Sequence, residues 1–186
     1  MNYTNLTSLE ILKTEDIKSV AERAFIADEV FELLSVAYAN VRGGLLFSSA
    51  DELVMNTSVW RVIYFQSTIV GVVIYKAKRG LKMVALALAN NLTKPIKKHT
   101  KTMLSYLFKV TFSNSWMEVS EGAERFIIQN GGERYLVSNT LASKLTGKDI
   151  LGYCDDGYHY KREINGVIKT KVIIGKPKFT RHILVS

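Results

Sequence analysis

The stretch that decides the fold is residues 69–112, IVGVVIYKAKRGLKMVALALANNLTKPIKKHTKTMLSYLFKVTF. Its first half holds two runs rich in β-branched and apolar residues, separated at Arg79-Gly80, which predicts two antiparallel strands. The second run ends near Asn90, and a basic segment then leads into an amphipathic helical pattern. A helix N-terminus placed after a strand is suited to binding phosphate, because free backbone N–H groups and the helix dipole favour an anion there. Four lysines lie at this junction: Lys94, Lys97, Lys98 and Lys101.

Composition places the chain among soluble globular proteins. Its 186 residues, 47% apolar and 23% charged, predict a single domain over residues 1–186. Twenty-five Lys and Arg against 17 Asp and Glu give a net charge of +8, which favours an anionic partner. The one cysteine, Cys154, excludes an internal disulfide and removes the usual metal-binding thiolates. No apolar run reaches membrane-spanning length and the N-terminus lacks a secretion signal, so we expect a cytoplasmic protein.

On the N-terminal side, the pattern predicts a strand at residues 6–13 and a long helix over residues 17–38. The apolar residues of that helix recur every three or four positions: Ile17, Val20, Ala24, Ala27, Phe31, Leu34 and Tyr38. A brief helix over residues 50–55 follows, capped by Ser48 or Ser49. Residues 59–66, VWRVIYFQ, add a third strand, and the short turns join all three strands as an antiparallel meander.

On the C-terminal side, the helix after the meander carries Pro95 in its first turn and a buried stripe of Ile96, Thr100, Met103, Leu104, Leu107 and Phe108. Residues 115–119 then form a strand parallel to the one before the helix, because a connection of that length lets the chain cross over. Ser120 is expected to cap a helix that ends at residues 130–132. A short strand at 134–137, a helix near 141–145 and a hairpin around Asn165-Gly166 complete the chain. We therefore expect an α/β (α+β) fold with a mixed, mostly antiparallel sheet of six to seven strands flanked by helices.

This order resembles the GNAT superfamily of acyl-CoA N-acyltransferases over nearly the whole chain, including divergent phage members such as the Mom-type DNA-modification proteins. In that family a loop with the pattern Gln/Arg-x-x-Gly-x-Gly/Ala holds the pyrophosphate of acyl-CoA through backbone N–H groups. The matching residues are Lys97, Lys98, His99, Thr100, Lys101 and Thr102. Lysine replaces Gln or Arg, and threonines replace the glycines, so β-branched side chains stand where the backbone should approach phosphate. The resemblance implies acetyl-CoA as acyl donor. We expect no metal, because the three histidines have no acidic partner at ligand spacing.

The chemistry that the resemblance implies needs the two parallel strands to splay. Backbone N–H groups of Leu86, Ala87, Leu88 and Ala89 would then meet the thioester carbonyl. No acidic residue lies on residues 81–89, so Glu118 is the candidate base, with Ser120 beside it. Tyr135 is the candidate acid, and Tyr158 and Tyr160 are alternatives.

Each of these residues also has a structural reading. Glu118 faces either a cleft or bulk water by strand alternation, the lysines can form a solvated helix face, and His99 and His159 are expected at the surface. Two functional hypotheses stay open. The first is an N-acyltransferase whose acceptor amine is unidentified, with a nucleic-acid or nucleotide amine among the options. The second is a non-catalytic module of the same fold, binding nucleic acid or a partner protein through Lys94–Lys101 and the basic hairpin of Lys161, Arg162, Lys169 and Lys171.

Overall fold

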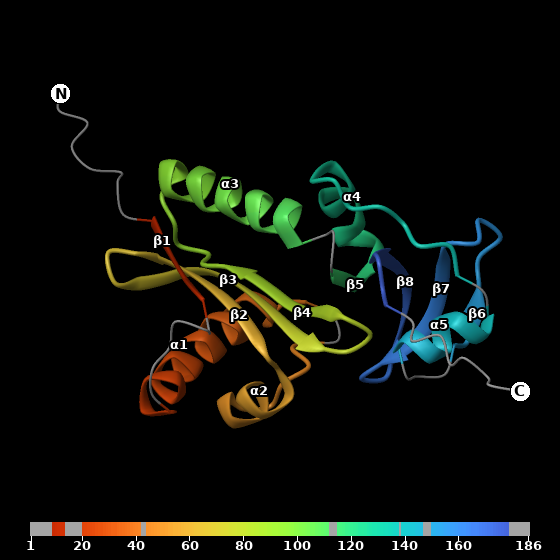
Figure 1. Ribbon diagram of the computed structural model, residues 1–186, viewed down its shortest axis with the longest axis horizontal. Coiled ribbons are helices and arrows are strands. Elements are labelled where there is room, and N and C mark those ends of the chain that lie inside the picture. The colour runs from red at the N-terminus through yellow and green to blue at the C-terminus, as the bar shows by residue number, and fades with distance from the viewer. Residues whose placement is uncertain are drawn as a thin grey trace, which may run out of the picture.

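A computed structural model describes residues 9–13, 20–41, 44–111, 115–137, 139–146 and 150–178. The elements are β1 (Leu9–Lys13), α1 (Val20–Tyr38), α2 (Ala50–Asn56), β2 (Val59–Phe65), β3 (Thr68–Ala77), β4 (Leu81–Leu88), α3 (Lys94–Thr111), β5 (Ser115–Ser120), α4 (Glu121–Gln129), α5 (Asn139–Thr146), β6 (Gly152–Tyr153), β7 (His159–Ile164) and β8 (Val167–Gly175). The strands form one sheet in the order β1-β2-β3-β4-β5-β8-β7-β6. The helices α1, α2 and α5 lie on one side of the sheet, and α3 and α4 on the other (Figure 1). The predicted fold class and element order are confirmed; residues 6–8 and 14–19 lie outside the described part of the chain.

The meander follows from its turn residues. Gln66-Ser67, Arg79-Gly80 and, in the C-terminal hairpin, Asn165-Gly166 all have positive φ at both positions. Two-residue turns of this kind match the right-handed twist of antiparallel strands, which is why they join strands so closely. The register confirms antiparallel pairing of β2 with β3, of β3 with β4 and of β7 with β8.

Alternating side chains divide the core between the two faces of the sheet. On the α3/α4 face, Leu104 and Leu107 of α3 and Ile127 of α4 pack on Met83 and Met117. On the opposite face, α1 and α2 cover the meander, and α5 covers Trp116, Tyr160 and Ile173. Each half of the sheet is therefore buried on both sides, and charged side chains inside it need local partners.

Three local predictions differ from the structure. In α1, the predicted Ala27 and Leu34 are buried, but Ala24 is exposed, and Ile26 and Val30 complete the buried stripe. Residues 134–137 form no strand: a single bridge joins Arg134 to Ile174. The two-residue strand β6 was not predicted, because a pair of residues carries no periodic signal; it brings the sheet to eight strands. Among the described residues, no helix is both long and apolar enough to cross a bilayer.

Candidate active site

The two parallel strands β4 and β5 pair over only three positions. Leu81, Lys82 and Met83 lie opposite Ser115, Trp116 and Met117, and the pairing then stops. Directly after it, the β3–β4 register skips Val84, since Ile74 pairs with Ala85 and Tyr75 with Met83. An extra residue of this kind bends its strand, so the bulge turns β4 away from β5 at the point where the two strands part.

The parted strands border a cavity of about 580 Å³, which we call the slot. Its walls come from both strands, from the end of α1 and the loop after it, from α4, and from the β7–β8 hairpin. The lining residues are Ala37, Tyr38, Val41, Gly44, Leu46, Met83–Leu88, Asn90, Met117–Ser120, Ala123, Ile127, Ile164, Lys169 and Lys171. Because α4 and α1 lie on opposite faces of the sheet and both line the slot, the slot extends through the sheet from one face to the other.

The predicted backbone donors of β4 divide into two groups. The Ala89 N–H donates to Val70 O (3.0 Å), and alternation directs the Ala87 N–H to the same neighbour, β3. The N–H of Leu86 and that of Leu88 point the other way, toward the slot. At Leu86 the hydroxyl of Tyr38 donates to the carbonyl oxygen (3.2 Å) and accepts a long hydrogen bond from the backbone N–H (3.5 Å). Burial raises the pKa of Tyr38 more than the bond at Leu86 lowers it, so the hydroxyl stays protonated at neutral pH. Sequence reasoning placed Tyr38 in the core and missed it.

Glu118 lies on the slot wall within a cluster of cations. Arg162 Nη1 contacts both of its carboxylate oxygens (2.6 and 2.7 Å), and Lys82 Nζ lies 3.3 Å from Oε2. Lys171 Nζ, on the neighbouring strand β8, donates to Ser120 Oγ (2.9 Å). We call Lys82, Arg162 and Lys171 the cation cluster. Each of the three is buried, with 8–9% of its surface exposed.

Burial and charge act in opposite directions on these groups. For Glu118, burial favours the neutral acid, but the attraction of Lys82, Arg162 and Lys171 prevails and lowers the pKa. Burial also lowers the pKa of Lys82, and it lowers the pKa of Lys171 to about 8 despite the nearby Glu118. Glu118 is thus an ionised counter-ion held by two cations, which makes it a weak proton acceptor.

Ser120 occupies the N-cap position of α4, but its side chain makes no capping hydrogen bond. Its hydroxyl accepts from Lys171 instead, so the predicted cap is wrong in its chemistry although right in its place. Glu118 and Ser120 do lie together in the slot, as predicted. Tyr135 is not among the described residues that line the slot; it packs on the α5 side near Ile173.

The alternative tyrosines also lie away from the slot lining. Tyr158 packs against the core beneath α3 and α4, whereas Tyr160 is fully buried under α5. Burial and the charge of Glu118 raise the pKa of Tyr160, which keeps its hydroxyl neutral. Of the tyrosines considered, Tyr38 is thus the one whose hydroxyl reaches the backbone of β4 in the slot.

Residues 97–102, which match the family's pyrophosphate loop, lie inside α3. The Lys97 N–H already donates to Thr93 O (2.9 Å), and the following N–H groups belong to the helix. Thr100 is fully buried: its hydroxyl donates to Ile96 O, and a Cβ added at Gly71 would lie 3.2 Å from its methyl group. Thr100 therefore packs α3 against β3. The free backbone donors come earlier, at Lys94 and Ile96, because the first turn of a helix has no partners for its N–H groups.

His99 and His159 differ in their surroundings. His99 is exposed, and its Nδ1 donates to Pro95 O (3.0 Å). His159 is half-buried between Glu124 of α4, at 2.8 Å from Nε2, and Asp156, which contacts Nδ1. Burial alone would lower the pKa of His159, but the two carboxylates raise it overall. His159 thus joins α4 to the β6–β7 turn, which its place in the sequence did not indicate.

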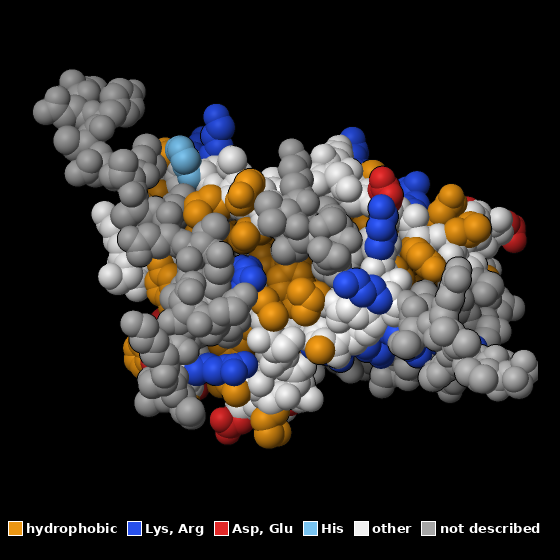
Figure 2. Space-filling view, viewed as in Figure 1, with side chains coloured by type: hydrophobic (Ala, Val, Ile, Leu, Met, Phe, Trp, Pro, Cys, Tyr) orange, Lys and Arg blue, Asp and Glu red, His pale blue; other side chains and the backbone are white. Residues whose placement is uncertain are grey.

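The basic residues do not form one surface. Lys94, Lys97, Lys98 and Lys101 of α3 are exposed, as expected for a solvated helix face. Of the four basic residues of the C-terminal hairpin, Lys161 is exposed and Lys169 half-buried, whereas Arg162 and Lys171 are buried, with Lys171 lining the slot. On the face of the molecule drawn in Figure 2, the Lys and Arg side chains are accordingly scattered and do not form one continuous patch. The predicted basic hairpin is therefore, in part, a buried cluster.

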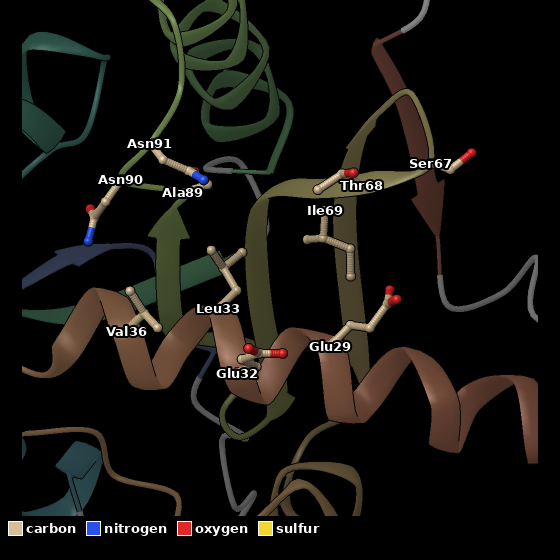
Figure 3. Close-up of a pocket in the computed structure, with 10 residues that line it drawn as sticks. All are labelled: Glu29, Glu32, Leu33, Val36, Ser67, Thr68, Ile69, Ala89, Asn90 and Asn91. Atoms are coloured by element: carbon tan, nitrogen blue, oxygen red, sulfur yellow. The ribbon is translucent and has the colours of Figure 1, made fainter.

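A second cavity, of about 470 Å³, lies between α1 and the ends of β3 and β4 (Figure 3). It is lined by Glu29, Glu32, Leu33, Val36, Ser67, Thr68, Ile69, Ala89, Asn90 and Asn91. Its charged residues are the two glutamates of α1, in contrast to the cations of the slot, and Asn90 lines both cavities. The slot is the candidate active site, because it exposes backbone polar groups between two parted strands.

Comparison with known family models and with curated proteins gives no match. Solved structures do match. The aminoglycoside 6'-N-acetyltransferase from Enterococcus faecium is 13% identical, with a TM-score of 0.54 over 92% of this chain and 98% of that chain. An acyl-CoA N-acyltransferase from Pseudomonas aeruginosa is 6% identical, with a TM-score of 0.52 over 91% of this chain and 100% of that chain. The ribosomal-protein-S18-alanine N-acetyltransferase from Escherichia coli is 10% identical, with a TM-score of 0.51 over 96% of this chain and 100% of that chain.

These likenesses establish the fold: the chain has the GNAT fold of acyl-CoA N-acyltransferases, as its sequence predicts. Identities of 6–13% carry no residue roles, so the chemistry has to be argued from the slot. The likeness to phage members of the superfamily stays a prediction.

Proposed function

We propose that the protein is an N-acyltransferase that moves an acyl group, acetyl in the simplest case, from acyl-CoA to an amine. The observation that carries this proposal is the parting of β4 from β5 after Met83, which leaves a cavity with the backbone of β4 along one wall, not paired to β5. The lining between the strands is largely apolar, which fits a thioester arm. The Leu86 N–H, which donates to the Tyr38 hydroxyl in this structure, would donate to the thioester carbonyl oxygen once the acyl donor binds.

The phosphates of the donor would bind at the start of α3. Lys94 and Ile96 supply free N–H groups, and Lys97 and Lys98 supply exposed charge in the first two turns of the helix. This arrangement replaces the glycine-rich loop with side-chain charge and a shorter run of backbone donors. It accounts for Thr100 in the sequence, since Thr100 has a packing role that a glycine could not fill.

In the reaction, the neutral amine attacks the thioester carbonyl carbon, forming a C–N bond as the C–S bond breaks. The Leu86 N–H stabilises the negative oxygen, and the Tyr38 hydroxyl gives its proton to the departing thiolate. The nitrogen loses a proton on becoming an amide, and this proton restores the tyrosine. Glu118 holds Arg162 and Lys82 in place instead of accepting the amine proton, because its pKa is lowered.

The experiment is a measurement of CoA release from acetyl-CoA with a panel of primary amines. Tyr38→Phe keeps the ring and removes the proton donor, so kcat should fall by about 10²-fold while the KM for acetyl-CoA changes little. Tyr106→Phe, an exposed position on α3, is the control. Equal kcat in wild type and Tyr38→Phe would remove Tyr38 from the mechanism.

A non-catalytic binding module is the second candidate, favoured by the helical conformation of residues 97–102. It predicts no acetyl-CoA binding and a DNA affinity that decreases steeply with salt. The inward position of Arg162 and Lys171 counts against the hairpin as its nucleic-acid surface.

A further inference from the structure

A buried cluster beside the slot carries an excess of positive charge, and Lys171 and Glu118 of this cluster line the slot. Three buried cations, Lys82, Arg162 and Lys171, surround one carboxylate, Glu118, so two positive charges have no matching negative charge within the cluster. Buried charges in proteins are ordinarily paired, because leaving water is costly for an ion. An unbalanced cluster beside a cavity therefore indicates that a negative charge from outside belongs there.

The hydrogen bonds of the cluster also indicate that an acceptor is missing. Both oxygens of Glu118 are used by Arg162, and one of them also by Lys82. Lys171 donates to the neutral hydroxyl of Ser120, and no described carboxylate lies within 4 Å of it. The Nε of Arg162 has no partner among the described residues. The cluster thus has more donors than acceptors.

The position of the cluster separates it from the proposed phosphate site on α3. Met117 and Val119 face the core under α3 and α4, so Glu118 and Ser120 face the opposite side of the sheet. Lys171 lies opposite Ser120 in the register and shares that side with Ile173, which packs under α5. If the phosphates of the acyl-CoA bind at α3, the cation cluster does not contact them and is available to the amine acceptor. Lys169 and Lys171 line the slot beside the cluster.

We infer that the acceptor is an amine that also carries an anionic group, a carboxylate or a phosphate, and that Lys171 binds this group at the slot wall beside Ser120. The inference rests on the proposed acyl transfer. Lys171 is a binding residue in this account, and Arg162 and Lys82 keep Glu118 engaged so that it does not neutralise Lys171. An uncharged amine of the same length would leave the buried charge of Lys171 unmatched.

The first test measures anion binding without any reaction. Inorganic phosphate is titrated at constant ionic strength and saturating acetyl-CoA, and the shift in Tm is followed for wild type, Lys171→Met, Lys171→Arg and the control Lys161→Met. Wild type, Lys171→Arg and Lys161→Met should be stabilised by phosphate, and Lys171→Met much less. Equal shifts in wild type and Lys171→Met would overturn the anion site.

The second test compares three acceptors of similar length: 2-aminoethyl phosphate, 3-aminopropanoate and 2-aminoethanol. The value of kcat/KM should be at least tenfold higher for one of the anionic acceptors than for 2-aminoethanol. The preferred anionic acceptor then shows whether the site binds a phosphate or a carboxylate. Lys171→Met should reduce this preference below threefold, and Lys161→Met should retain it. Transfer with equal or better use of 2-aminoethanol would overturn the inference while leaving the acyltransferase intact.

A pH profile adds a readout specific to Lys171. Its neighbours on β4, β5, β7 and β8 are Lys82, Glu118, Tyr160, Arg162 and Lys169. Because burial lowers its pKa to about 8, the preference for the anionic acceptor should decline above that pH in wild type, and at higher pH in Lys171→Arg. If acetyl-CoA does not bind at all, the acyltransferase proposal fails, and the phosphate titration still decides whether the cluster is an anion site.

Discussion

The strands β4 and β5 behave differently along their length. Over Leu81–Met83 and Ser115–Met117 the two strands are paired, and side chains pack across them. Trp116 Nε1 donates to Lys78 O (2.7 Å), and Lys82 Nζ lies 4.7 Å from the centre of the Trp116 ring. Beyond Met83 and Met117 they part, although β5 keeps its full pairing with β8 up to Ser120. The opening is therefore made by β4 turning away at its bulge, with β5 held rigidly by its other neighbour. A pair of strands can thus be core at one end and binding site at the other.

Charge marks the same division. The paired end is packed with apolar and aromatic groups apart from Lys82, which reaches from there to Glu118, whereas Glu118, Arg162 and Lys171 lie at the parted end. If this contrast is correct, removing a cation that contacts Glu118 should cost more stability than a change at an exposed site nearby. The following predictions test each side of the comparison.

The largest effect is expected from Arg162→Met. It leaves the buried Glu118 with Lys82 as its one remaining close cation, so the free energy of unfolding should fall by about 3–5 kcal/mol. Denaturant unfolding measures this, with Lys161→Met, an exposed neighbour, as the control. The double variant Glu118→Leu/Arg162→Met should recover part of the loss. A fall below about 0.5 kcal/mol for the single variant would mean that the cluster does not hold the parted end together.

Lys171→Met should act in the opposite direction. The pKa of Lys171 is about 8 in the folded protein and higher in the unfolded chain, so the unfolded chain binds more protons between these values. Wild-type stability should therefore rise as the pH increases from about 8 to about 10, and at pH 7 the buried charge costs at most about 3 kcal/mol. Unfolding curves at pH 7 and pH 10 should show that rise in wild type and not in Lys171→Met. The same rise in both proteins would place its origin elsewhere.

At the paired end, Gly175→Ala should cost about 2 kcal/mol. Gly175 has φ +96°, and a Cβ there would lie 2.4 Å from Ser115 O, so the substitution strains the backbone and presses on β5. Gly152→Ala is the control, because a Cβ at Gly152 meets nothing within 4 Å. Thermal unfolding compares the two. A cost at Gly175 no larger than that at Gly152 would show that the paired end is not closely packed.

The smallest effect is expected from His159→Gln. The network of His159 and Arg134 with Glu124 and Asp156 matches two cations with two carboxylates, unlike the cation cluster. Because the folded pKa of His159 is raised, its stabilisation should be complete below about pH 6.5 and lost as the pH rises through the folded pKa. The network is partly exposed, so the difference between wild type and variant should stay below about 1 kcal/mol. A difference that grows with rising pH would contradict this account.

The sequence predicted the sheet and helices well because turn residues and periodicity act locally. Arg79-Gly80 and Asn165-Gly166 define two hairpins, and the length of the segment around Pro95 requires a crossover and hence a parallel strand. The position of the slot also followed, since it depends on that parallel pair. The bulge at Val84 carries no sequence signal, because residues 83–89 are all apolar and a shift in the alternation of side chains cannot be seen in such a run.

The site residues were harder to predict because they come from distant elements. Glu118 and Ser120 were found on the strand beside the slot, but Lys82, Arg162 and Lys171 join them from three other strands. Tyr38 comes from the end of α1, 48 positions before Leu86. Alternation could have indicated that Arg162 and Lys171 point inward, since both share a strand face with buried residues, Tyr160 and Ile173.

The most direct measurement of the central claim is a calorimetric titration of acetyl-CoA into wild type, Ala123→Trp and Gln129→Trp. Ala123 and Gln129 are both exposed on α4, but only Ala123 lines the slot. The account predicts saturable binding to wild type and Gln129→Trp, with affinity at least tenfold lower for Ala123→Trp. Equal affinity in all three proteins, or no binding to wild type, would contradict the claim that the parted strands hold an acyl-CoA.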